Sequence, residues 1–203
     1  MRAQEAKRRE ENEIEFSRIV AFSDGVFAIA ITLLVLSLSV DDLSRDDLWQ
    51  GIWDLRENLL AYGISFAVIG RFWLVHHRFF SEVTAFDNRL LSLNMLYLAF
   101  IVLIPFSSQL LGDFGGETPS VVVYAGNLVA CILVGTWMFL YAQSAGLTLA
   151  GIERRRESIV RAAYIAAVFL LSIPVAFVAP GWAPLLWLAL FYDPGDRYAP
   201  DLG

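Results

Sequence analysis

The chain has 203 residues, of which 57% are hydrophobic, and its mean hydropathy is +0.57. This apolar share exceeds that of a soluble domain, so we expect an all-α integral membrane protein whose residues belong mostly to spans. The net charge of −6 says little about partners, because the charges are segregated into the connections. The single cysteine, Cys131, excludes an intrachain disulfide and a thiolate metal site.

Six apolar segments follow one another, and we expect six transmembrane helices in one domain that covers residues 1–203. The segments are 22–40, 59–77, 90–111, 121–141, 159–179 and 182–192. The last is short for a span, and such a segment crosses by thinning the bilayer or by packing deep in a bundle. Pro105 and Pro174 predict kinks in the third and fifth segments, which membrane helices tolerate.

The connections between the segments differ in charge. Basic residues gather at the N-terminus and in the second and fourth connections: Arg2, Lys7, Arg8, Arg9, Arg78, Arg89, Arg154, Arg155 and Arg156. Acidic residues gather in the first and third connections: Asp41, Asp42, Asp46, Asp47, Asp54, Glu57, Asp113 and Glu117. The positive-inside rule therefore predicts that both termini are cytoplasmic. Residues 1–17 form a charged cytoplasmic segment, either a helical extension of the first span or a frayed tail, and their lack of an apolar core disfavours a cleavable signal peptide.

The first apolar segment begins with Ser23 and Asp24. A carboxylate at the entrance of a span is costly in lipid and should face protein or water. At about 100° per residue, these two residues lie opposite a stripe of Ile29, Leu33 and Leu36. We therefore expect Asp24 to form a polar clamp with donors from neighbouring helices. The candidates at the same depth are Trp73, His77 and Asn94.

One stretch of the sequence carries a recognisable motif. Residues 18–36 read RIVAFSDGVFAIAITLLVL, in which Arg18, Phe22, Ser23 and Asp24 stand at fixed spacing. This run resembles the RxxxFSD signature helix of the transmembrane protein 175 family, the lysosomal potassium channels and their prokaryotic relatives. HHRFF after the second segment and LNMLYLAFIVLIPF in the third resemble that family's next two helices. Beyond about residue 111 the resemblance is architectural.

The resemblance implies a prokaryotic channel that forms a homotetramer in the cell membrane. In this family the first helices line the pore, and an isoleucine five residues after the motif aspartate forms the narrowest point, here Ile29. Further hydrophobic layers correspond to Leu33 and Leu36, and Thr32 is the polar position near the ion path. The motif residues are expected to join the structural polar network. The permeant ions are potassium and other monovalent cations, with no cofactor.

Physical reasoning makes such a pore plausible and leaves alternatives open. A ring of isoleucines gates by dewetting but cannot replace an ion's hydration shell, which favours modest selectivity. From periodicity alone, the stripe is more typical of ordinary helix packing or lipid contact than of a pore lining. Arg18 lies on the same stripe, where a ring of arginines would repel cations unless the side chains snorkel aside. A second interpretation is a proton-conducting or proton-coupled transporter that uses Asp24 and His77 as a relay.

Other classes lack support in the sequence. No GxSxG motif is present, and we expect no enzymatic activity. His76 and His77 are adjacent and project about 100° apart on a helix, so they cannot share a haem iron or another metal ion. The arginine triplet at 154–156 fixes topology more readily than it binds nucleic acid. The expected partners are further copies of the chain, the bilayer and monovalent cations.

Overall fold

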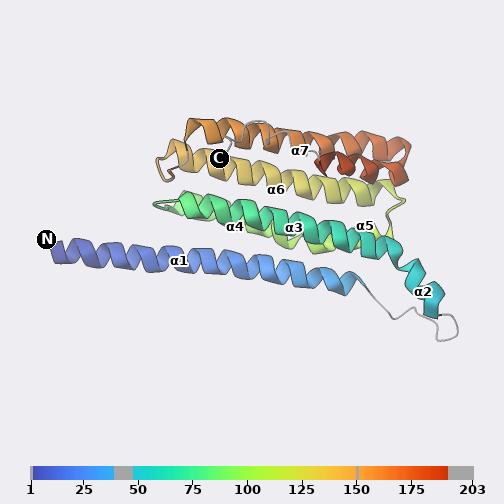
Figure 1. Cartoon of the computed structure of the whole chain (residues 1–203), viewed down its shortest axis with the longest axis horizontal. Helices are drawn as coiled ribbons and strands as arrows, with labels where there is room; N and C mark the ends of the chain where they lie inside the picture. Colours follow the sequence, from blue (N-terminus) through green and yellow to red (C-terminus); the bar gives the residue numbers. More distant parts are fainter. Residues whose placement is uncertain (1, 39–47, 150, 192–203) are drawn as a thin grey trace, which may run out of the picture.

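The computed structural model describes residues 2–38, 48–149 and 151–191, and this part of the chain is helical (Figure 1). The α-helices are α1 (Arg2–Leu33), α2 (Leu48–Asp54), α3 (Arg56–Glu82), α4 (Asn88–Val102), α5 (Ile104–Asp113), α6 (Thr118–Ser144) and α7 (Ile152–Val178). Two 3₁₀ helices follow α1 and α7, namely η1 (Leu34–Ser37) and η2 (Pro180–Phe191).

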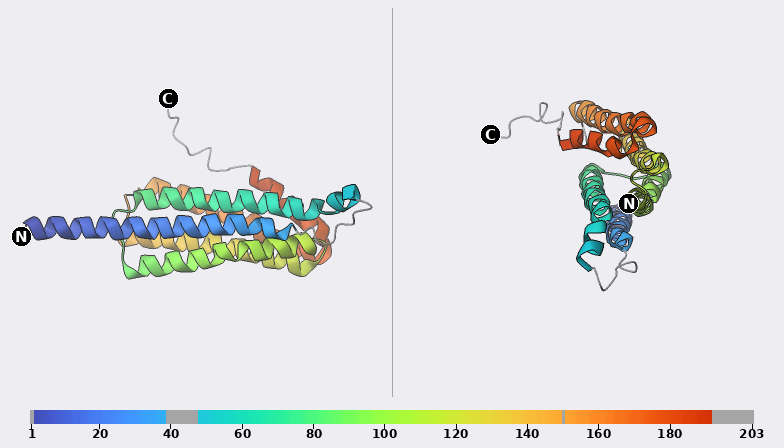
Figure 2. Two further views of the ribbon diagram at one scale, coloured as in Figure 1. Left: turned by 90° about the horizontal axis from the view of Figure 1, so that it is seen from below. Right: turned by 90° about the vertical axis from the view of Figure 1, so that its right-hand side faces the viewer.

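The long helices lie side by side along the longest axis of the molecule. Helix α1 occupies one edge, α3, α4 and α5 lie next to it, and α6 and α7 with η2 form the opposite edge (Figure 1). Helix α1 contacts α3, α4 and α5, while α6 packs against α4, α5 and α7. The first part of α1 projects beyond the bundle (Figure 2), so the N-terminal segment continues the first span as a helix.

Within the described residues, five stretches are long and apolar enough to cross a membrane. They are Ile14–Ser37, Leu48–Glu82, Asn88–Asp113, Thr118–Ser144 and Arg155–Val178. The sixth predicted segment instead forms the 12-residue 3₁₀ helix η2. At a rise of about 2.0 Å per residue it extends about 24 Å, less than the hydrocarbon core of about 30 Å. Pro180 and Pro184 lack the N–H groups that an α-helix needs, and both lie in this element.

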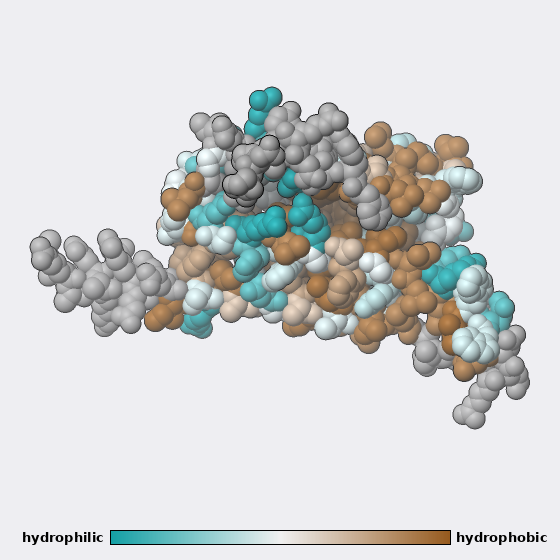
Figure 3. All heavy atoms as spheres, viewed as in Figure 1, coloured by the Kyte–Doolittle hydropathy of each residue, from teal (hydrophilic) through white to brown (hydrophobic). Residues whose placement is uncertain are grey.

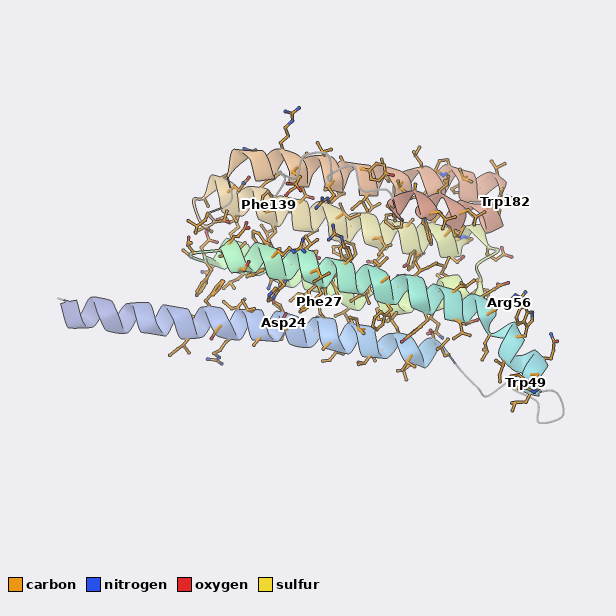
Figure 4. The ribbon with its side chains drawn as sticks, in the orientation of Figure 1. Asp24, Phe27, Trp49, Arg56, Phe139 and Trp182 are labelled. Atoms are coloured by element: carbon orange, nitrogen blue, oxygen red, sulfur yellow. The ribbon has the colours of Figure 1, made fainter. Side chains whose placement is uncertain are left out.

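The two ends of the bundle differ in the side chains they carry. Trp49 and Trp182 lie at one end (Figure 4), where they are 84% and 71% exposed. Exposed arginines flank the α3–α4 connection at the other end, at Arg78 and Arg89. Tryptophans favour the membrane interface and arginines the cytoplasmic side. The positive-inside rule predicts that the arginine-rich end faces the cytoplasm.

Pro105 interrupts the third apolar segment, as predicted. Helix α4 ends at Val102 and α5 begins at Ile104, with Leu103 between them. A proline ring clashes with the carbonyl four residues earlier and offers no N–H, so the helix cannot continue unchanged. The Asn127 side chain of α6 donates to the Phe100 carbonyl at 3.3 Å beside this break. In contrast, α7 is helical through Pro174.

Asp87 is the residue that precedes α4 and caps its N-terminus, at the arginine-rich end of the bundle. Its carboxylate accepts hydrogen bonds from the Leu90 N–H, at 2.8 Å, and from the Tyr141 hydroxyl. The hydrogen bond from Tyr141 and then that from Leu90 hold the pKa of Asp87 below its ordinary value. Asp87 is therefore an N-cap whose charged form is favoured by folding.

We expect Asp87→Ala to lower the free energy of unfolding by about 1 kcal/mol at pH 7, because the cap is lost. Because folding lowers this pKa, the charge stabilises the protein above the ordinary carboxyl pKa of about 3.9. This stabilisation is lost as the pH falls through the lower pKa of the folded state. Thermal unfolding of wild type and Asp87→Asn in detergent, measured between pH 3 and 7, tests this. The two curves should converge in acid, and a constant difference would contradict the role of the charge.

Candidate functional site

Helix α1 has one face that packs against the bundle. The buried residues on this face recur at alternating intervals of four and three: Ser23, Phe27, Ala30, Leu34 and Ser37. This spacing places them on a single side of α1 and of η1, to which Leu34 and Ser37 belong. Asp24 and Phe27 lie on the side of α1 that faces α3 (Figure 4). The periodicity of the first span therefore corresponds to a real division between two faces.

The opposite face of α1 and of the following η1, to which Leu36 belongs, carries the aliphatic stripe. Ile29, Leu33 and Leu36 are 59%, 38% and 71% exposed, and within the described part of the chain they point away from the bundle. Thr32 is exposed on the same side, and its hydroxyl donates to the Ile29 carbonyl at 2.9 Å. Because α1 lies at the edge of the bundle, this face is available to lipid or to other copies of the chain.

A buried hydrogen-bonded triad joins α1 to two neighbouring helices. The Asn94 amide of α4 donates to the Ser23 hydroxyl at 3.0 Å, and its Oδ1 lies 2.9 Å from Nε2 of His76 on α3. Because an amide oxygen only accepts, Nε2 of His76 is the donor in this arrangement. All three side chains are at most 3% exposed. We call Ser23, Asn94 and His76 the polar anchor.

Asp24 has a separate environment beside the polar anchor. The indole N–H of Trp73 donates to Asp24 Oδ1 at 2.9 Å. The ring of His77 lies against Trp73, with 5.5 Å between the ring centroids. Of the three predicted partners, Trp73 is the one that hydrogen-bonds the Asp24 carboxylate. Asn94 instead hydrogen-bonds Ser23, and His77 contacts the indole ring.

His76 is the site residue that sequence reasoning missed, since it selected the exposed neighbour His77. The spacing along α3 is the signal that identifies His76. The buried residues Ser65, Ile69, His76 and Phe80 follow one another at intervals of about one or two helical turns. The ring of His76 packs against Phe27, Phe80 and Tyr97, with centroid distances of 5.3, 4.5 and 5.7 Å. Its burial follows from its place in the α3 periodicity.

Two motif residues lie outside the polar anchor. Phe22 is 53% exposed, and Arg18 is also exposed. Their spacing from Gly25 and Ile29 places both on the outer face of α1, so the network predicted for the whole motif includes only Ser23 and Asp24. Arg18 therefore stands on the stripe side, near the arginine-rich end of the bundle.

An acidic residue lies at the far end of α1. The Asn58 amide donates to Asp113 Oδ1 at 2.7 Å and to the Ser37 carbonyl at 3.5 Å. Asn58 thus holds the Asp113 carboxylate beside the last residue of η1. Of the acids predicted for the first connection, Asp41, Asp42, Asp46 and Asp47 lie outside the described residues, as does Val40, whereas Glu57 lies in the first turn of α3.

The described part of the chain offers no cluster of metal ligands. Within residues 2–38, 48–149 and 151–191, no three His, Cys, Asp or Glu side chains lie close enough together to hold a metal ion. The polar groups near the stripe consist of hydroxyls, amides, an indole and single carboxylates. Such groups can orient helices and attract cations, but they do not form a closed coordination site.

Comparisons with known proteins agree with this architecture. The model of the family described as endosomal/lysosomal potassium channel TMEM175 matches residues 18–105. A potassium channel of Chamaesiphon minutus is 38% identical over 149 residues, which are 70% of this chain and 73% of that one. A crystal structure described as a lysosomal potassium-selective channel TMEM175 homologue from the same organism has a TM-score of 0.73 and 28% identity, and covers 91% of this chain and 96% of that chain.

Other relatives match over shorter lengths. A potassium channel of Streptomyces collinus is 41% identical over 101 residues, which are 49% of each chain. TMEM175 of Gallus gallus, named an endosomal/lysosomal proton channel, is 39% identical over 110 residues, which are 50% of this chain and 22% of that one. The chain therefore spans about half the length of the Streptomyces relative and about a fifth of the avian one.

Proposed function

Because this chain belongs to the TMEM175 family of channels, we propose that it is a potassium-permeable cation channel of modest selectivity. It acts as a homotetramer in the plasma membrane of a prokaryote. The observation that carries the proposal is the stripe of Ile29, Leu33 and Leu36, which α1 presents away from its own bundle. Four such faces around an axis form a pore with successive aliphatic rings.

The polar members of the outer face support a pore over simple lipid contact. Exposed apolar side chains are comfortable in lipid, whereas a charged side chain on a lipid-facing surface is costly. Arg18 and Thr32 lie on the same side of α1 as Ile29. A water-filled path would hydrate both residues, with Thr32 one turn from the constriction. Arg18 stands at the mouth, where its side chain must turn aside so that a ring of arginines does not repel cations.

The polar anchor has a structural role in this proposal. It fixes the rotation of α1 about its own axis, because Ser23 must meet Asn94 on the bundle side. The same rotation directs Ile29 away from the bundle. Buried polar pairs in membranes specify helix orientation at modest energies of about 0.6 to 2 kcal/mol. The anchor thus supports the pore without contacting ions.

Asp113 supplies a charge suited to attracting cations. Its carboxylate is held by Asn58 next to Ser37, at the end of the helix that carries the stripe. A negative charge at a pore mouth raises the local cation concentration, and salt screens this effect. Because aliphatic rings provide no oxygen ligands at the constriction, discrimination among monovalent cations stays modest.

Ion flux through reconstituted protein tests the proposal directly. Purified protein in liposomes should pass potassium down an imposed gradient, with sodium flux smaller but measurable. Protein-free liposomes and a large organic cation are the controls. Potassium flux that needs a coupled substrate, or no flux above that of empty liposomes, would contradict a channel.

Proton conduction is the second candidate, and the proton-channel name of the Gallus gallus relative is what favours it. It would use Asp24 and His77, which lie on either side of Trp73. An imposed pH gradient at zero potassium gradient measures this activity. A relay requires Asp24→Asn and His77→Gln to abolish proton flux while the oligomer stays intact. Loss of the oligomer in Asp24→Asn, with His77→Gln unaffected, would instead indicate a structural clamp.

A further inference from the structure

A groove that the proposed pore does not use lies between α3 and α7. It has a volume of about 800 Å³, with α6 as its floor. Hydrophilic side chains gather beside this hollow in the half of the bundle nearer the N-terminus, and hydrophobic atoms line its base (Figure 3). The volume is in the range of sites that hold small ligands.

The groove carries an excess of positive charge on both walls. Arg71 and Arg78 line it from α3, and Arg156 and Arg161 line it from α7. The acidic lining residues are Glu82 and Glu157, and Glu157 forms an ion pair with Arg161 at 3.4 Å. Four arginines against two glutamates leave two net positive charges, which complement an anionic group.

The remaining surface of the groove is apolar. Phe72 and Val75 of α3 face Ile165 of α7 across a floor that includes Ile132 of α6. A cationic rim joined to an aliphatic trough suits an amphiphile with an anionic head and a hydrocarbon chain. A small soluble anion would leave this trough unfilled.

Two arginines stand at the depth of a lipid headgroup. Arg78 is one turn before the end of α3 at Glu82, and Arg156 is one turn after the beginning of α7 at Ile152. One turn is about 5.4 Å along the axis, so both lie near the membrane surface at the arginine-rich end. The positive-inside rule assigns this end to the cytoplasm, where the leaflet is rich in anionic lipids that basic pockets between helices bind.

We propose that this groove binds one anionic phospholipid of the cytoplasmic leaflet. Its phosphate contacts Arg78 and Arg156, and an acyl chain lies along Ile132 of α6. His76 and Tyr97 also line the groove, so the bound acyl chain contacts His76, a member of the polar anchor. The proposal requires that the protein lies in a membrane, but it does not depend on which ion the protein conducts.

Lipid retention by the full-length protein in detergent tests this site without an ion-flux assay. Native mass spectrometry would count phosphatidylglycerol bound to wild type, with phosphatidylcholine as the neutral comparison. Each arginine near an anionic lipid is worth about 1 kcal/mol, which corresponds to roughly fivefold in affinity. We expect Arg78→Gln and Arg156→Gln each to weaken phosphatidylglycerol binding about fivefold, and the double variant to weaken it about thirtyfold.

Arg155→Gln is the matched control, because Arg155 is exposed at the same end but does not line the groove. It should retain phosphatidylglycerol as wild type does. Equal retention of phosphatidylcholine by wild type would overturn the proposal even if the variants failed to fold. Displacement of phosphatidylglycerol by inorganic phosphate would also overturn the proposal. So would the finding that no lipid binds because a second copy of the protein covers the groove.

Discussion

Replacing Ile29 with asparagine is expected to raise potassium flux about tenfold. Ile29 is exposed on the outer face of α1, where the proposed tetramer has its narrowest ring. A ring of amides holds water by hydrogen bonds, so the constriction stays wet and the barrier to ion passage falls. A reduction of about 1.4 kcal/mol in this barrier corresponds to a tenfold higher rate. Single-channel recording in symmetric potassium measures the change as conductance and open time.

Leu170→Asn provides a control for the chemistry of the substitution. Leu170 is 50% exposed on α7, at the edge of the bundle opposite to α1. Leu170 is the sixteenth residue of the span Arg155–Val178, and Ile29 is the sixteenth residue of the span Ile14–Ser37. An asparagine there should leave the flux unchanged. If Ile29→Asn behaves like Leu170→Asn, Ile29 does not form the constriction.

Asn94→Leu is expected to destabilise the bundle by about 1–2 kcal/mol. The substitution removes the acceptor of the buried His76 N–H and the donor to Ser23. A buried polar group without its partner costs about 1–3 kcal/mol, and measured helix–helix hydrogen bonds in membranes fall near or below the lower end of this range. Thermal unfolding in detergent and the fraction of intact oligomer in size-exclusion chromatography measure the loss.

A double variant separates the hydrogen bond from the packing. Replacing both polar partners with apolar groups is nearly neutral where shape is kept, so His76→Phe should restore part of the stability that Asn94→Leu loses. Ser92→Ala is the control in α4, since the exposed Ser92 hydroxyl bonds the Asn88 carbonyl of its own helix. An Asn94→Leu protein as stable as Ser92→Ala would show that the anchor contributes nothing.

Periodicity predicted the two faces of α1 correctly, because the direction of a side chain on a helix depends on local geometry alone. Ile29 and Leu36 are exposed, while Ser23 is buried. The partner of Asp24 was predicted less completely, since three candidates at one depth are equivalent in sequence. Only the packing of α3 against α1 brings the Trp73 indole N–H to the Asp24 carboxylate. It leaves His77 in contact with the indole ring.

Hydropathy predicted six spans, of which five are long apolar stretches in the described residues, while the last, predicted to be short, forms a 3₁₀ helix. The composition of 182–192 is apolar, but the prolines at 180 and 184 favour the short 3₁₀ helix η2 over a spanning α-helix. The interruption at Pro105 was predicted for the same physical reason, and the structure places it at Leu103. At Pro174, however, α7 remains helical, so a proline alone does not determine where a helix ends.

The sequence by itself determined the membrane class of this protein, its helical segments and the division of the first span into a polar side and an aliphatic stripe, because hydropathy and helical period are local properties. The tertiary structure decided that the stripe points away from the bundle. The tertiary structure alone decided which polar groups meet and where the arginine-lined groove lies. Contact between Asn94, Ser23 and His76 requires three helices at matched depth and rotation. Such relative placement results from packing over the whole bundle, and no single segment encodes it.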